Sequence, residues 1–144
     1  MEHTFAAADG ALLQLARAIH ATGYEFVTPT PATIVRVRAR PGTAWAHDLR
    51  DVFGWSRPFR TGAVLPAIVA AMEEAGVLLP HEDGHRSAVR LSSLDGLLFM
   101  HSAFPTDAAD AVFFGPDTYR FARAIAAHAP VRPVHRAVDV GCGA

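Results

Sequence analysis

Apolar residues recur at helical spacing in two parts of the chain. One stripe runs from Leu12 to Ile19 and stops before Gly23. A second stripe lies within residues 65–75, and Gly76 follows it in the position that commonly ends a helix. In a helix with 3.6 residues per turn, both patterns place the apolar side chains on one face. They predict two amphipathic helices.

Between these two helices the local signals conflict. Thr30 followed by Pro31 is a good helix start, because threonine caps the first turn and proline suits the first helical position. Residues 33–38 are largely β-branched and alternate, which favours a strand. We favour a short helix that ends before Pro41. Residues 46–53 predict a further helix, with its apolar residues directed inward.

After the helix at 65–75 the pattern changes to short apolar runs separated by turns. The runs cover residues 77–79, 88–91 and 97–100, and Asp-Gly pairs lie between them. This spacing predicts two or three short strands in a small antiparallel hairpin. Helix, loop, helix and hairpin form a winged-helix-like arrangement, which we expect over residues 1–104 in an α+β fold.

These helices and strands each have one apolar face and need one another to bury it. We therefore expect one shared core. Its predicted members are Leu49, Phe53, Ile68, Met72, Val77, Leu79, Val89, Leu91, Leu98 and Met100.

The C-terminal third begins a different pattern. An apolar run at 111–114 predicts a strand, and Gly-Pro-Asp at 115–117 ends it. Residues 118–128 predict a helix, with Tyr119, Phe121, Ala122 and Ile125 available for burial. Residues 136–140 then predict a strand that leads into a Gly-x-Gly turn, where the backbone can approach a ligand closely.

Residues 138–144, Val-Asp-Val-Gly-Cys-Gly-Ala, resemble the first motif of class I S-adenosylmethionine-dependent methyltransferases. Residues 111–121 resemble the segment that precedes this motif in the branch that modifies ribosomal RNA guanines and release-factor glutamines. The resemblance implies that residues 105–144 are the lead-in and first strand of a Rossmann-like catalytic domain that is truncated after this strand. Because the other strands of its parallel sheet are then missing, we expect residues 131–144 to be poorly ordered or paired with an improvised neighbour such as residues 111–114. It also implies S-adenosyl-L-methionine as cofactor and an RNA or protein as methyl acceptor.

The cofactor residues that the resemblance implies are Phe114, Asp117, Thr118, Asp139, Gly141, Cys142 and Gly143. The catalytic loop of this branch would lie beyond residue 144. The helix and the acidic residue that normally complete the cofactor site after such a loop are also not in the chain. We therefore expect the 144 residues alone to be inactive and to bind the cofactor very weakly.

Two other functions are open. The first is a winged-helix module that binds nucleic acid, but residues 65–75 carry Glu73 and Glu74 and no arginine, a poor surface for a DNA groove. The second is a dimerisation module with Trp55 and Phe59 as exposed anchors.

Charge gives little further support for nucleic-acid binding. The formal net charge is −1, and every basic residue is an arginine, which excludes lysine Schiff-base chemistry. Arginines cluster locally, and we interpret them mainly as solvated surface, although arginine also suits phosphate. The clustered residues are Arg36, Arg38, Arg40, Arg50, Arg57, Arg60, Arg86 and Arg90.

The remaining candidate chemistry is weak. The single cysteine, Cys142, suits a reducing cytoplasm, and the apolar runs are far shorter than a membrane span. His81 and His85 flank a turn and have no third soft ligand nearby, so we expect no metal site. Ser92 and Ser93 lack the strand-turn-helix setting of a hydrolase nucleophile.

Overall fold

The computed structural model describes residues 7–129 and 133–140 of the chain. Within them the protein is a mixed α/β structure with five helices and two small antiparallel hairpins, as the α+β prediction requires at this level. The helices are α1 (Ala7–His20), α2 (Pro31–Arg38), α3 (Leu49–Phe53), α4 (Pro66–Glu74) and α5 (Pro116–His128). The strands are β1 (Leu78–His81), β2 (Gly84–Ser87), β3 (Val89–Leu94) and β4 (Leu97–Ser102).

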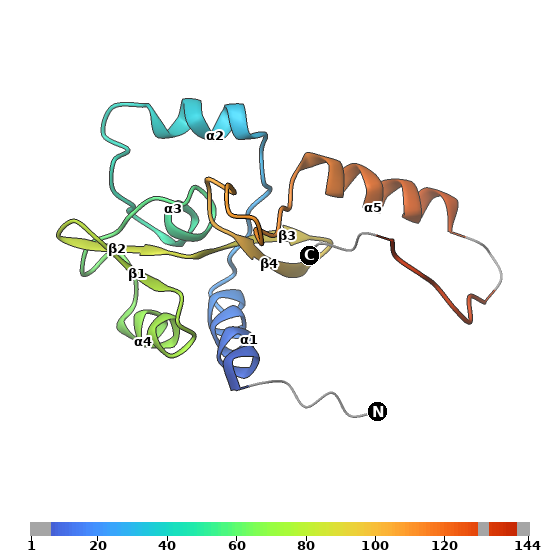
Figure 1. The fold of residues 1–144 in the computed structure, drawn as a ribbon, viewed down its shortest axis with the longest axis horizontal. Coiled ribbons are helices and arrows are strands. Elements are labelled where there is room, and N and C mark those ends of the chain that lie inside the picture. Colours follow the sequence, from blue (N-terminus) through green and yellow to red (C-terminus); the bar gives the residue numbers. More distant parts are fainter. Residues whose placement is uncertain (1–6, 130–132, 141–144) are drawn as a thin grey trace.

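The hairpins form the middle of the body, and the helices lie on either side of it (Figure 1). Helices α1 and α4 lie on one side, while α2 and α3 lie on the other. Helix α5 extends away from the body beyond the β3–β4 hairpin.

The capping residues of α2 and α3 explain where these two helices begin. Thr30 caps α2, because its Oγ1 accepts a hydrogen bond from the Thr33 amide at 3.3 Å, and the capping prediction is confirmed over the strand pattern. Helix α3 begins at Leu49, later than predicted. Its N-cap is Asp48, whose side chain accepts from the Asp51 amide at 2.9 Å. The preceding Ala46 instead donates its amide to Pro58 O at 2.7 Å.

The strand region holds four strands, one more than the largest predicted number. Strand β1 pairs with β2 from Leu78↔Ser87 to His81↔Gly84, and β3 pairs with β4 from Val89↔Ser102 to Leu94↔Leu97. The turn between β3 and β4 has positive φ at both Asp95 and Gly96. That backbone is the type I′ geometry that Asp-Gly favours, so this hairpin follows directly from the sequence.

One core holds the helices and hairpins together. Nine of the ten predicted core residues belong to it, and Leu79 is half-buried outside it. The fully buried members include Phe53, Val52, Leu15, Ile19, Met72 and Leu91. Apolar faces of α1, α3, α4, β3 and β4 therefore share one interior, as their patterns require.

Residues 111–114 do not form the predicted strand. They run beside the end of β4, where the Ser102 amide donates to Val112 O at 3.0 Å and the Val112 amide donates to Ser102 Oγ at 2.9 Å. One of these two bonds uses a side chain, so no regular strand ladder forms.

The predicted burial along α5 is also wrong for its two largest apolar residues. Phe121 is 59% exposed and Ile125 is 54% exposed, while Tyr119 and Ala122 are half-buried. The reason is that no described element packs on that face of the helix, which projects from the body (Figure 1).

The strand predicted over residues 136–140 is absent from the described structure. Residues 136–139 have no regular secondary structure, and Val138 and Val140 are 80% and 92% exposed. A strand of a parallel sheet needs neighbouring strands, and the described chain provides none here. No described helix is both long and apolar enough to cross a bilayer.

Candidate functional site

Phe114 anchors the segment that leads into α5. Its side chain is 1% exposed and lies among three aromatic rings, Phe99, His101 and Tyr119, each with a centroid 5.3 Å away. The His101 ring is nearly parallel to that of Phe114, at 21°, and the Tyr119 ring meets it edge-on at 86°. Such an aromatic cluster contributes packing beyond its buried area. It fixes the start of α5 against the β3–β4 hairpin.

The predicted cofactor residues Asp117 and Thr118 lie in the first turn of α5. Gly115 is the N-cap residue, and its amide donates to Thr118 Oγ1 at 3.4 Å, while the Thr118 amide donates to Gly115 O at 3.0 Å. Thr118 therefore closes the helix start. Asp117 is exposed, and its carboxylate lies at the positive end of the helix dipole, free to accept hydrogen bonds.

Of the other predicted cofactor residues, the structure describes only Asp139. It is exposed, and no hydrogen bond or ion pair joins it to this turn or to another described residue. Gly141, Cys142 and Gly143 lie outside the described residues. Among the described cofactor residues, the structure brings together Phe114, Asp117 and Thr118.

A buried polar chain next to Phe114 was not predicted from the sequence. Tyr119 Oη accepts from the Thr28 amide at 3.2 Å, Thr28 Oγ1 hydrogen-bonds Ser92 Oγ, and Ser92 Oγ lies 2.7 Å from His101 Nε2. Its members come from four separate segments, so no local pattern could reveal it. Ser92 and His101 are 0% and 3% exposed, which rules out a hydrolase role for this pair because no substrate can reach it.

The environment of His101 keeps its imidazole neutral. Burial lowers its pKa from 6.5 to about 4, and the nearby positive charge of Arg90 acts in the same direction. Below pH 6.5 the unfolded chain takes up a proton that the folded chain accepts only near pH 4. This residue's contribution to stability is therefore complete above pH 6.5 and is lost as the pH falls toward 4.

We expect acidification from pH 7 to pH 5 to lower the free energy of unfolding less in a His101→Gln variant than in the wild type. Glutamine can hydrogen-bond Ser92 but does not titrate in this range. Urea denaturation at a series of pH values measures how the free energy of unfolding changes with pH in each protein. An equal change in the two proteins would contradict the inference that His101 is neutral in the folded state.

Two of the arginines interpreted as surface are in fact buried. Arg90 is 2% exposed and donates from Nε to Gly54 O at 2.9 Å, and burial lowers its pKa to about 10. Arg57 is 7% exposed and forms an ion pair with Asp51. Both hold the loop after α3 in place and are not available to bind phosphate.

The proposed dimer anchors are also not free. Phe59 is 2% exposed, and Trp55 packs edge-on against Phe26 with centroids 5.2 Å apart. His81 and His85 likewise pack on aromatic rings, Trp45 and Phe59 respectively. Within the described chain no three His, Cys, Asp or Glu residues are grouped so as to hold a metal ion.

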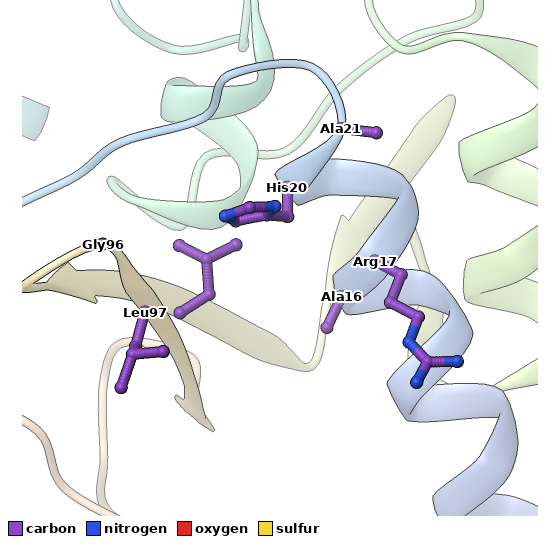
Figure 2. Close-up of a pocket in the computed structure, with 7 residues that line it drawn as sticks. Ala16, Arg17, His20, Ala21, Gly96 and Leu97 are labelled. Atoms are coloured by element: carbon purple, nitrogen blue, oxygen red, sulfur yellow. The ribbon is translucent and has the colours of Figure 1, made fainter.

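Two of the hollows on the surface of the described chain have mainly apolar walls. The first has a volume of about 340 Å³ and lies between the end of α1 and the β3–β4 turn. Figure 2 shows the His20 ring extending toward Gly96 and Leu97, while the Arg17 side chain points away. This hollow contains few polar groups that could orient a ligand.

The second hollow, of about 450 Å³, lies between α4, the loop before it and β2. Its walls are mainly apolar, and its rim carries charged and polar side chains.

Among known proteins, no family model, characterised protein or solved structure matches this chain.

Proposed function

We propose that this chain is the N-terminal, substrate-recognition part of an S-adenosylmethionine-dependent methyltransferase that acts on RNA or protein. The observation that carries the proposal is the sequence Val-Asp-Val-Gly-Cys-Gly-Ala at 138–144, preceded at the expected place by the Phe-Phe-Gly-Pro-Asp-Thr run at 113–118. Residues 105–144 are then the lead-in to a Rossmann-like domain, with the acceptor selected by the winged-helix-like residues 1–104.

The exposed apolar residues of the C-terminal third support this proposal. Phe121 and Ile125 form an uncovered stripe on α5, and Val138 and Val140 are exposed in a segment without regular secondary structure. Apolar side chains grouped on an exposed face can mark an interface. A parallel sheet would cover the α5 stripe and pair with residues 136–140, burying both sets at once.

The start of α5 fits one wall of a cofactor site. Phe114 is locked beneath the turn by its aromatic neighbours, while Asp117 is exposed at the helix N-terminus and can accept hydrogen bonds from a ligand. Bound S-adenosylmethionine would supply an activated methyl group, and the protein's part is to position the acceptor in line with it. Asp139, Gly141, Cys142 and Gly143 would hold the cofactor from the adjoining loop.

The alternative of a DNA-binding winged helix is less well supported. Helix α4 takes the place of a recognition helix, and it has no basic residue and two exposed carboxylates, Glu73 and Glu74. Such a helix repels a phosphate backbone.

Transfer of a labelled methyl group tests the proposal. The protein product of the complete reading frame is incubated with methyl-tritiated S-adenosylmethionine and a cell extract, with the 144-residue chain and the extract alone as controls. We expect the complete product to raise the label in RNA or protein above that of the extract alone, and the 144 residues to give no such increase. No increase in either macromolecule with the complete product would contradict the proposal.

A further inference from the structure

The hollow beside α4 is built mostly from apolar side chains. Phe59, Val64 and Leu65 form one wall, and Pro66, Val69 and Ala70 of α4 form the other. Leu65 is 62% exposed, so apolar surface continues from the hollow onto the outside of the molecule. A volume of about 450 Å³ accepts a large apolar side chain together with part of its backbone.

Of the two charged side chains on the rim of the hollow, Arg60 and Glu73, only Arg60 has a partner of opposite charge among the described residues. Arg60 is already engaged, because its guanidinium carbon lies 4.0 Å from the Trp45 ring centroid and its Nε lies 3.1 Å from Asp83 Oδ2. Glu73 also lines the hollow and forms no ion pair with any described residue. The rim therefore presents one carboxylate whose charge is not neutralised.

The position of this carboxylate increases its attraction for a cation. Glu73 and Glu74 occupy the last turn of α4, where the helix dipole is negative, and no basic residue accompanies them. Acidic residues are unfavourable at this end of a helix, since their charge adds to the negative end of the helix dipole. A positive group placed here is attracted both by the carboxylates and by the negative end of the helix dipole.

We propose that this hollow binds an apolar side chain of a protein partner that carries a lysine or arginine beside it. The inference rests on the proposed function, because the partner would be the protein that accepts the methyl group. Apolar walls and an adjacent unneutralised carboxylate suit such a segment, whereas the phosphates of RNA would be repelled by Glu73 and Glu74. The exposed Leu65 gives the segment apolar surface to cross as it leaves the hollow.

Binding of short fluorescent peptides to the 144-residue chain tests this inference. Each peptide has one central leucine, phenylalanine or methionine, flanked by arginines in one set and by glutamates in the other. Fluorescence anisotropy should give dissociation constants about tenfold lower for the arginine set, a difference of about 1.4 kcal/mol. Glu73→Lys should abolish or reverse this preference.

A variant that fills the hollow provides the second part of the binding test. Ala70 is exposed and lines the hollow, so Ala70→Trp should fold normally, which its thermal melt verifies, and weaken binding about tenfold or more. Ala124→Trp, at an exposed position on α5, is the matched control and should bind as the wild type does.

Three results would overturn the inference: equal affinity for both peptide sets, no measurable binding of either set, or binding that a folded Ala70→Trp leaves unchanged. The inference would also be overturned if a ribosomal RNA hairpin binds the wild-type chain and the Ala70→Trp variant no longer binds it. No cofactor is present in these measurements, so their outcome is independent of methyl transfer. Failed peptide binding would leave the proposed function standing, and failed methyl transfer would leave the hollow's specificity standing.

Discussion

Replacing Gly84 by alanine is expected to lower the free energy of unfolding by about 3 kcal/mol, near the upper end of the usual cost of overpacking. A methyl group on Gly84 would lie closer than 3.0 Å to Phe59 O and 2.9 Å from a ring carbon of Trp45. The carbonyl cannot move away easily, because Phe59 and His85 exchange two backbone hydrogen bonds of 2.7 and 2.9 Å. The substitution must break this bridge or displace the β1–β2 hairpin.

Urea denaturation measures the effect, and Gly10→Ala is its control. Gly10 lies within α1, and among the described residues no atom beyond its chain neighbours and the backbone of its own helix lies within 4 Å of the place its methyl group would take. Alanine there should stabilise the protein by roughly 0.5–1 kcal/mol, because glycine is unfavourable in a helix. A Gly84→Ala protein as stable as the wild type would show that the hairpin does not pack on residue 59 as described.

Replacing Phe114 by alanine should cost about 3–5 kcal/mol, the range for removing a fully buried phenylalanine side chain. The ring fills the space between Phe99, His101 and Tyr119, and its loss leaves a cavity at the base of α5. The bond from the Thr28 amide to Tyr119 Oη depends on the same contact. We expect α5 to separate from the body before the shared core unfolds.

Phe121→Ala is the matched control for this prediction. It removes the same kind of side chain from within α5, at a site that is 59% exposed, so its cost should be below about 0.5 kcal/mol. Hydrogen exchange of the α5 amides distinguishes local release from global unfolding. Equal destabilisation by the two substitutions would mean that Phe114 does not anchor the helix.

The sequence was sufficient wherever local chemistry sets the structure. Thr30 and Pro31 decided in favour of a helix over a β-branched stretch, and Asp95-Gly96 specified the β3–β4 turn. Helical periodicity also identified the apolar faces of α1 and α4, whose Leu15, Ile19 and Met72 are fully buried. These features depend on residues that are near one another in the chain.

Prediction failed where the outcome depends on a distant partner. Phe121 and Ile125 have the spacing of a buried stripe, but no described element covers them. The segment at 136–140 was expected to lack the other strands of its sheet, and it has no regular secondary structure and exposes Val138 and Val140. The error at α5 arises because periodicity shows which face is apolar and not whether anything packs on it.

The site was predictable in part for the same reason. The Gly115 to Thr118 turn is local, and a helix start was predicted there, but at residue 118 and not at Pro116, where α5 begins with Gly115 as its N-cap residue. The burial of Phe114 and the chain from Tyr119 to His101 join segments up to 91 residues apart, which no short pattern records.

Calorimetric titration with S-adenosylmethionine tests the central claim most directly, because it needs no knowledge of the methyl acceptor. The titrated proteins are the 144-residue chain, the product of the complete reading frame, and that product carrying Asp139→Ala. We predict micromolar affinity for the complete product, at least tenfold weaker binding for Asp139→Ala, and no measurable heat for the 144 residues. Micromolar binding to the 144 residues alone, or no binding to the complete product, would contradict the account.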